Sequence, residues 1–350
     1  MNRFSHAPDI IDRISGLSSA IWTYAGVAAC FELGIVDGLG APVTAAELAG
    51  RLDPDAELVA DLIGVLAALG AVERAPGGEG AARWVATPAF ESFRSGALGR
   101  VTRAGIRSDH LQTAEALRRA RAGALAPGWD HLDPDVLVAQ GETAGLFRLC
   151  AEHVLPSLPG LREALGRPGA TFLDIGAGVG VISSELCMVY PEVAAECLEP
   201  NAAARRIGRE RIRTAGLGAR ITFIAHGVEE LDAIRRYDLA IVPQPFLPPA
   251  AFEAGIARVG RALRNGGWLL VLALDVSDAD PVPAAANRVR ARLWGGGAIG
   301  SGELLDRLAR SGFEDARAHP PVGGYRMFAA RVPEHRTVSR ADAAPVAVRA

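Results

Sequence analysis

The stretch Thr171-Phe-Leu-Asp-Ile-Gly-Ala-Gly-Val-Gly180 decides how this chain folds. It begins as a short apolar run typical of a strand, passes Asp174, and continues into glycines at positions 176, 178 and 180. Because glycine has no Cβ, this pattern indicates a sharp turn where a ligand approaches the backbone closely. We therefore predict a nucleotide-type binding turn with Asp174, Gly176, Gly178 and Gly180 as binding residues.

Strand-like and helix-like patterns alternate on both sides of this turn, from about residue 169 to residue 332. The strand-like segments are 171–174, 194–198, 221–225, 239–242 and 268–274. Such alternation predicts an α/β fold with a Rossmann-like, doubly wound parallel sheet that binds ligands at the carboxyl ends of its strands. Two further strand patterns, 314–318 and 325–330, are joined by a turn too short for a parallel crossover, so an antiparallel terminal hairpin is expected.

The first 96 residues have a different, mostly helical pattern. Helices are expected over 17–33, over 45–51 after a Thr44-x-x-Glu47 capping box, and over 55–69, followed by a two-stranded wing over 71–74 and 82–86. This order is typical of a winged helix. Its presumptive recognition helix, 55–69, carries three acids and no base, so DNA phosphates would repel it. A dimerisation and substrate-covering domain is therefore the preferred interpretation, with no nucleic-acid partner.

A helical connector is predicted over 97–166, and a disordered tail over 334–350. The arginines of the connector are interpreted as a solvated helix face. His131, Asp133 and Asp135 alternate around Pro134, but this spacing matches no defined metal motif, so a turn with capping acids is expected there and no metal site.

Composition excludes several classes of protein. A net charge of −3, from 40 acidic and 37 basic residues, gives no reason to expect a polyanion partner. The sequence contains no lysine, which rules out Schiff-base chemistry. Four widely spaced cysteines indicate neither a disulfide framework nor a zinc knuckle. The longest apolar run, 268–274, is too short to cross a bilayer, and the N-terminus lacks a signal-peptide core, so a soluble cytoplasmic protein without a membrane partner is expected.

The ligand of the glycine turn follows in part from its spacing. Dinucleotide-binding turns read G-x-G-x-x-G/A, whereas Val181 stands three residues after Gly178 here. This mismatch and the terminal hairpin disfavour NAD. Glu199 ends the second strand and is placed to accept hydrogen bonds from both hydroxyls of a ribose. Glu199 can at the same time serve as an acid near the N-terminus of the next helix.

Taken together, these residues resemble the class I S-adenosylmethionine-dependent methyltransferases, in particular the small-molecule O-methyltransferases of bacterial secondary metabolism and of plants. The resemblance covers most of the chain. It rests on Leu173-Asp-Ile-Gly-Ala-Gly-Val-Gly180, Glu199, Tyr237-Asp-Leu-Ala-Ile-Val242, Leu263-Arg-Asn-Gly-Gly-Trp-Leu-Leu-Val271, the helix-like stretch 302–313, and the front-end segments 28–35 and 43–49.

The resemblance implies how the chain is organised. It implies a dimerising winged-helix domain over 1–96, a connector over 97–166 that lines the acceptor pocket, and a catalytic domain over 167–333 that binds S-adenosylmethionine. Pro200 and Pro243 would also contact the cofactor. The family often ends its third strand in Gly-Asp, which receives the adenine amine. This chain has His226 and Gly227 there, and we expect these two residues to bind the cofactor, with backbone groups or Glu229 as the alternatives for the adenine contact.

The catalytic base of the resembling family is missing from its usual place. The family's His-Asp-Trp segment would fall near Leu247, inside Pro243-Gln-Pro-Phe-Leu-Pro-Pro249. A base is needed most for a neutral hydroxyl. His153 is the preferred substitute, ahead of His110, His226 and Glu142, because the helix ending at His153 lines the substrate pocket in that family. Gln244 and Phe246 should face the transferred methyl group and the acceptor.

Several functions stay open from sequence. The main expectation is methyl transfer to a small-molecule oxygen, with C-, N- or S-methylation of an already nucleophilic acceptor as the alternative. A methyltransferase fold acting as a non-methylating cyclase or isomerase would suit the missing base. A regulatory protein using the winged helix and an NAD-linked oxidoreductase are the remaining candidates.

Overall fold

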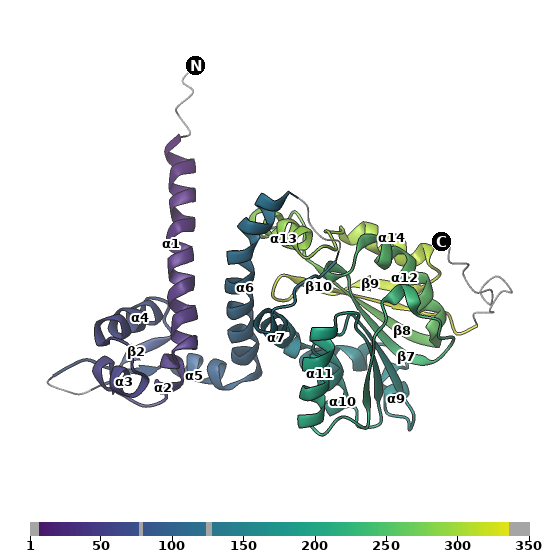
Figure 1. Ribbon diagram of the computed structural model, residues 1–350, viewed down its shortest axis with the longest axis horizontal. Coiled ribbons are helices and arrows are strands. Elements are labelled where there is room, and N and C mark those ends of the chain that lie inside the picture. Colours follow the sequence, from purple (N-terminus) through teal and green to yellow (C-terminus); the bar gives the residue numbers. More distant parts are fainter. Residues whose placement is uncertain (1–6, 77–79, 124–127, 336–350) are drawn as a thin grey trace, which may run out of the picture. The chain divides into compact units, whose positions relative to one another are not determined.

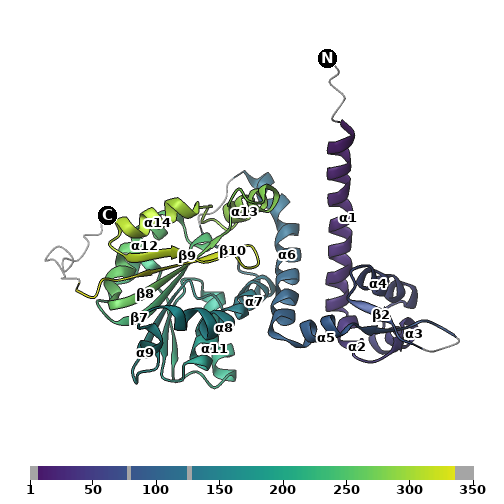
Figure 2. The same ribbon diagram turned by 180° about the vertical axis from the view of Figure 1, so that it is seen from behind.

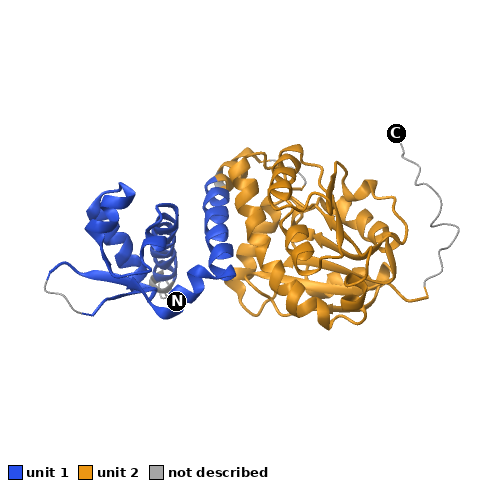
Figure 3. Cartoon of the chain, turned by 90° about the horizontal axis from the view of Figure 1, so that it is seen from below, with its two compact units in different colours: residues 1–114 blue, residues 115–350 orange. Residues whose placement is uncertain are grey.

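The computed structural model describes residues 7–76, 80–123 and 128–335. The chain divides into two compact units, residues 1–114 and 115–350 (Figure 3). The division falls within helix α6 (Ala97–Ala122), in the segment predicted as a helical connector. The tail predicted to be disordered lies outside the described residues from position 336 onward.

The first unit consists of helices and a small three-stranded sheet. Its elements are α1 (Ala7–Glu32), α2 (Ile35–Gly38), β1 (Val43–Thr44), α3 (Ala45–Leu52), α4 (Ala56–Ala68), β2 (Val72–Arg74), β3 (Arg83–Ala86), α5 (Pro88–Ser95) and the start of α6. The predicted capping box is confirmed, because the Glu47 amide donates to Thr44 Oγ1 and the Thr44 amide donates to Glu47 Oε2. The hairpin β2–β3 is antiparallel, and β1 pairs with β3.

Helix α1 begins ten residues earlier than the predicted 17–33 and exposes apolar side chains along its first half. Ile10, Ile14, Leu17 and Ile21 are between 54% and 65% exposed. Their spacing of four, three and four residues places them on one helical face. Residues 10–32 are long and apolar enough to cross a membrane by length and composition, a test that other kinds of helix also pass.

The second unit is built around a seven-stranded sheet in the order β6-β5-β4-β7-β8-β10-β9 (Figures 1 and 2). Its strands are β4 (Thr171–Ile175), β5 (Ala194–Leu198), β6 (Ile221–Ile224), β7 (Tyr237–Pro243), β8 (Leu263–Leu274), β9 (Glu314–Ala318) and β10 (Tyr325–Arg331). Strands β4 to β8 pair in parallel, whereas β10 is antiparallel to β8 and β9. The predicted parallel sheet and terminal hairpin are both confirmed, with β10 inserted between β8 and β9.

Helices cover both faces of this sheet, because its central strands are apolar on both sides. One face packs against α12 (Pro249–Ala262) and α14 (Ser301–Arg310). The other face packs against α9 (Leu161–Leu165), α10 (Val181–Val189), α11 (Ala202–Thr214) and the short helical segments between residues 143 and 157. Helices α7 (Pro134–Glu142) and α13 (Pro281–Leu293) complete the principal helices of the unit.

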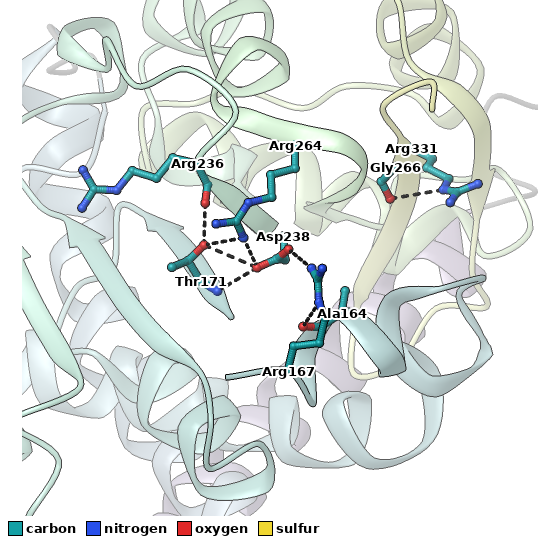
Figure 4. Close-up of polar contacts among 8 residues, drawn as sticks. All are labelled: Ala164, Arg167, Thr171, Arg236, Asp238, Arg264, Gly266 and Arg331. Atoms are coloured by element: carbon teal, nitrogen blue, oxygen red, sulfur yellow. Dashed lines mark hydrogen bonds and ion pairs between the residues drawn. The ribbon is translucent and has the colours of Figure 1, made fainter. Parts of the chain in front are cut away.

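A buried carboxylate ties together the amino ends of the central strands (Figure 4). Asp238, the second residue of β7, is 3% exposed and accepts hydrogen bonds from Arg167 at 2.9 Å, from the Thr171 amide at 2.9 Å, and from Arg264. Since Thr171 begins β4 and Arg264 lies in β8, one side chain links three strands. This network stabilises the end of the sheet opposite the glycine turn.

Candidate functional site

The predicted binding turn lies at the carboxyl end of β4, between the ends of its neighbours β5 and β7. Gly176, Gly178 and Gly180 have φ angles of 61°, 55° and 76°. These values lie in the left-handed region, which other residues adopt only with strain. The Gly176 amide donates to the Leu198 carbonyl at 2.8 Å, which ties the turn to the end of β5. The prediction of a sharp glycine turn is confirmed.

The three glycines serve different purposes. A Cβ at Gly180 would lie 3.0 Å from Phe223 Cζ and 3.1 Å from Ile212 Cδ1, so this glycine allows close packing of α10 against its neighbours. A Cβ at Gly178 would meet no described atom within 4 Å. Gly178 therefore combines a left-handed φ angle with open space beside its Cα atom. Close approach of a ligand to the backbone explains that combination.

Glu199 faces the same turn from the end of β5. Its side chain is buried, with Oε2 accepting from the Gly178 amide and Oε1 accepting from the Asn201 amide, both at 2.8 Å. Burial raises the pKa of Glu199, and these two amide bonds act against that rise. Each carboxylate oxygen has two lone pairs, so each keeps one acceptor position. Two adjacent free acceptor positions fit a vicinal diol.

Asp174 lies beneath the turn and is 1% exposed. Ser183 Oγ donates to its Oδ2 atom at 2.7 Å, whereas its Oδ1 atom is buried without a hydrogen-bond partner among the described residues. The pKa of Asp174 is raised to about 7, mainly by burial and to a smaller extent by the nearby Glu199, while the hydrogen bonds from Ser183 act in the opposite direction. An orphaned buried acceptor is rare and calls for a donor from outside the protein. The two acids also make this turn a poor site for a pyrophosphate, which they would repel.

The turn after β6 contains the predicted cofactor-binding residues His226 and Gly227, whose roles stay predictions. His226 is exposed, and Gly227 is buried with its amide donating to Glu230 Oε1 at 3.0 Å. A Cβ at Gly227 would lie 2.5 Å from both carboxylate oxygens of Glu229. The Glu229 carboxylate thus lies directly over the Gly227 backbone, where a larger residue would displace it. Pro200 is exposed after the end of β5.

The loop after β7 is held by polar contacts that involve Gln244. This residue is 1% exposed, and its Nε2 atom donates to the carbonyls of Gly296 and Gly297 at 3.1 and 3.0 Å. The Gly296 amide in turn donates to the Pro245 carbonyl at 3.0 Å. Pro243 is buried at the end of β7. The catalytic role predicted for Gln244 stays a prediction, while its amide nitrogen already joins two loops.

The predicted proton acceptors lie in several places. His153 is exposed in the short π-helical segment Cys150–Val154. In the same segment the Ala151 carbonyl accepts from the Tyr190 hydroxyl at 3.2 Å. Tyr190 follows the carboxyl end of α10, whereas the glycine turn precedes the amino end of this helix. His110 is exposed in the first unit, and Glu142 forms an ion pair with Arg211. The role of His153 as a base stays a prediction.

A segment that the sequence interpretation treated only as a turn also reaches the site. The Trp129 amide donates to the Phe246 carbonyl at 3.0 Å, and Asn201 Nδ2 donates to the His131 carbonyl at 2.8 Å. Asp133 caps α7 by accepting from the Asp135 amide, as the capping-acid interpretation predicted. Burial lowers the pKa of His131 to about 4, with a further lowering by Arg119. A tryptophan beside glycine and proline was the available sequence signal.

Aromatic side chains gather on the side of the site formed by β7 and β8. Phe246 stacks on Trp294 with ring centroids 4.5 Å apart, and Trp129 meets the edge or face of both, at 5.2 and 6.0 Å. Tyr325 lies on the far side of Trp294 at 6.4 Å. Offset and edge-to-face contacts of this kind stabilise a cluster of rings. The predicted position of Phe246 at the mouth of β7 agrees with its place in this cluster.

Comparison with known proteins places this geometry in context. Residues 172–267 match the model of a family described as a methyltransferase domain. No curated protein matches the chain. The chain is similar to the mitomycin 7-O-methyltransferase MmcR, with 17% identity, a TM-score of 0.68, and coverage of 94% of this chain and 99% of that one. These likenesses show the fold.

Two further solved structures have the same extent of similarity. An O-methyltransferase family protein from Burkholderia thailandensis is 17% identical, with a TM-score of 0.66 and coverage of 93% and 99% of the two chains. Human N-acetylserotonin methyltransferase, solved in complex with S-adenosylmethionine, is 16% identical, with a TM-score of 0.64 and coverage of 93% and 98%. The shared architecture extends over nearly the whole of this chain.

Proposed function

We propose that this chain is a class I S-adenosylmethionine-dependent methyltransferase and that it methylates an oxygen atom of a small secondary-metabolite acceptor. The proposal of an oxygen acceptor is supported by the solved structures it is similar to, which include methyltransferases for mitomycin and N-acetylserotonin. The single observation that carries the cofactor assignment is the turn after β4, where Gly178 faces open space beside the two free acceptor positions of Glu199.

The residues at this turn fit S-adenosylmethionine. Glu199 would accept from the two ribose hydroxyls, because each of its oxygens is bonded by only one backbone amide. The orphaned Oδ1 of Asp174 fits a donor brought by the ligand or by an ordered water. The two buried acids also suit a ligand with a positive charge. Gly176, Gly178, Pro243 and Gly227 would let the ligand approach the backbone.

The reaction needs mainly positioning from the protein. When bound, the cofactor supplies a methyl group on a positively charged sulfur, which an acceptor nucleophile displaces in line. Holding two reactants in line can supply roughly 7–11 kcal/mol of a barrier in favourable cases. In this chain that task falls to rigid elements, since Glu199 is fixed by two amides and Gln244 by two carbonyls. Trp129, Phe246 and Trp294 exclude water from the acceptor side.

The proton of the acceptor limits which acceptors fit. His153 is our proposed base for a neutral hydroxyl, and replacing a true base lowers the rate by roughly 10²–10⁴. If His153→Ala reduces the turnover number by less than threefold, no such base acts there. An acceptor that is already nucleophilic needs none, which keeps C-, N- and S-methylation as the alternative.

We further propose that the chain is a cytoplasmic homodimer and that the first 96 residues, a winged-helix-like domain, make the dimer. The apolar face of α1, formed by Ile10, Ile14, Leu17 and Ile21, supports this proposal, because its spacing suits packing against a second helix. Asp12 and Arg13 lie in the same helix, and charges of this kind disfavour a membrane as the occupant. Residues 97–166 would line the acceptor-binding region, and residues 167–333 would bind the cofactor.

Transfer of labelled methyl groups tests the proposal. Methyl-labelled S-adenosylmethionine is incubated with panels of phenols, amines, thiols and 2-oxo acids, and label in the product is counted. We expect label in one or more phenols and none when Glu199→Ala replaces the wild type. Label in an amine or thiol alone would replace oxygen by the alternative acceptor. Conversion of an acceptor without label would favour a cyclase or isomerase, which the anchored Gln244 also permits.

A further inference from the structure

Residues 128–131, which we name the strap, connect the ends of two strands that are not neighbours. At one end the Gly128 amide donates to the Gly295 carbonyl at 3.2 Å, and the Trp129 amide donates to the Phe246 carbonyl at 3.0 Å. At the other end the His131 carbonyl accepts from Asn201 Nδ2 at 2.8 Å. Phe246 follows β7, whereas Asn201 follows β5.

Sheet topology then determines what the strap crosses. In the strand order β5-β4-β7, β4 lies between the two strands to which the strap is bonded. A segment bonded beyond the carboxyl ends of both β5 and β7 must therefore pass the carboxyl end of β4. That end carries the glycine turn of residues 176–180, where the cofactor is assigned.

Side-chain packing supports the same placement. Trp129 packs against the cluster of Leu137, Val179, Val181 and Ala204, two members of which flank Gly180, and its ring meets that of Trp294. The helix that follows the strap also lies against the turn, because a Cβ on Gly141 of α7 would overlap Val179 Cγ2. The strap thus contacts both the cofactor turn and the aromatic cluster on the acceptor side.

Gly128 and Gly295 allow the backbone of the strap to pack closely against the neighbouring loops, and a side chain at either position would disrupt this packing. Gly128 has a φ of 79°, and a Cβ there would lie 2.8 Å from Pro248 Cδ. A Cβ on Gly295, with a φ of 86°, would overlap the backbone of Gly128. Only hydrogen bonds and van der Waals contacts close this junction, and each hydrogen bond contributes a modest net free energy. A segment held in this way can open without unfolding the sheet.

We propose that the strap is a gate over the cofactor, with Asn201 and Trp129 as its two positioning residues. Opening breaks the bonds at Asn201 or at Phe246 and Gly295, and closing restores them once the cofactor is in place. In the closed state the Trp129 ring packs against Phe246 and Trp294, so closure of the strap also positions these two rings on the acceptor side. This inference rests on the proposed function, because the ligand that the strap covers is the assigned cofactor.

A gate makes a kinetic prediction that a simple contact does not. Loosening a gate raises the association and the dissociation rate constants together, whereas removing a ligand contact raises the dissociation rate constant alone. The probe is S-adenosylhomocysteine, and both rate constants are measured by stopped-flow tryptophan fluorescence. Asn201→Ser removes the amide that holds His131 yet keeps a helix-capping side chain for α11. Gly128→Ala disturbs the other end.

The expected result is a five- to tenfold rise of both rate constants in Asn201→Ser, the size of one lost hydrogen bond. The equilibrium dissociation constant should change less than threefold. Gly128→Ala should act in the same direction. Gly302→Ala is the matched control, because a Cβ there meets nothing within 4 Å and α14 is far from the strap in sequence. Its rate constants should equal those of the wild type.

Hydrogen exchange gives a second measurement. Saturating S-adenosylhomocysteine should slow exchange of the Gly128 and Trp129 amides in the wild type and slow it less in Asn201→Ser. Unchanged rate constants in both variants would overturn the gate, as would a rise confined to dissociation, which would make Asn201 a direct contact. If the wild-type protein does not bind the probe at all, the cofactor assignment fails and the gate fails with it.

Discussion

Substitution of single glycines separates binding from folding at the turn after β4. Gly178 and Gly180 both have left-handed φ angles, so alanine at either position carries a backbone strain of roughly 1–2 kcal/mol. At Gly180 the new Cβ also presses on Phe223 and Ile212 at 3.0 and 3.1 Å, and overpacking of this kind costs roughly 1–3 kcal/mol more. We therefore expect Gly180→Ala to lose about 2–5 kcal/mol of unfolding free energy.

Gly178→Ala should lose more affinity for the cofactor than Gly180→Ala, although it should lose less stability. The new methyl group of Gly178→Ala extends into open space that we assign to the cofactor. We expect the dissociation constant of S-adenosylhomocysteine to rise at least a hundredfold, which is about 2.7 kcal/mol, with a loss of stability of only about 1–2 kcal/mol. Calorimetric titration and urea unfolding measure the two quantities on the same samples.

The comparison has a clear refutation. Gly302→Ala reports the effect of a glycine replacement in open space without positive φ; it should leave affinity unchanged and raise the unfolding free energy by at most about 1 kcal/mol, because alanine favours helix α14. If folded Gly178→Ala binds S-adenosylhomocysteine within threefold of the wild type, the open side of Gly178 does not face the cofactor. The assignment of the binding turn would then be wrong, whatever the result at Gly180.

Five other variants test the buried acid, the electrostatic network and the dimer. Because the pKa of Asp174 is raised from 3.8 to about 7, the folded chain binds more protons than the unfolded chain between these values, and this group's contribution to stability falls as pH rises. Asp174→Asn should therefore gain about 2 kcal/mol relative to the wild type between pH 5 and pH 7 in urea unfolding, and an unchanged difference would contradict the raised pKa. Asp238→Ala should lose about 2–4 kcal/mol because buried partners lose their acceptor, whereas Arg167→Ala, with a side chain 61% exposed, should lose under about 1 kcal/mol; equal losses would refute the buried network. Ile14→Asp should convert a dimer to the 36.6 kDa monomer in size-exclusion chromatography with light scattering, while Leu58→Asp should not, and a monomeric wild type would rule out the dimer.

Local sequence patterns were sufficient for the fold and for the turn. The sequence pattern predicted a strand over 171–174, and the structure extends this strand, β4, only by Ile175. The glycines of the turn directly follow the strand, and Glu199 directly follows β5, so each was recognisable from its immediate neighbours. The capping box at Thr44 and the terminal hairpin were equally local. In each case the residues that form the element also determine its conformation, so their spacing along the sequence was enough to predict it.

Contacts across long sequence separations could not be derived in this way. The Asn201 bond to the His131 carbonyl joins residues 70 positions apart, and the Gln244 bonds to the loop after α13 span more than 50 positions. Either side chain could have faced solvent on sequence grounds. His226 follows β6 and its side chain is exposed, so its contact with the cofactor stays a prediction. Loop conformation, which depends on the packing of other loops, decided these cases.

The hydrogen bonds that fix the loop after β7 indicate that its residues orient the acceptor and do not take up its proton. A carboxamide is not a general base, and Gln244 holds the loop instead, because its Nε2 atom donates to the carbonyls of Gly296 and Gly297 while the Pro245 carbonyl accepts from the Gly296 amide. This loop is therefore built to hold a shape. Since Glu199 is fixed with similar firmness on the cofactor side, both reactants would be oriented by pre-formed contacts. Orientation alone can account for a large part of a displacement barrier, so a fixed loop is a sufficient design for an acceptor that arrives already nucleophilic.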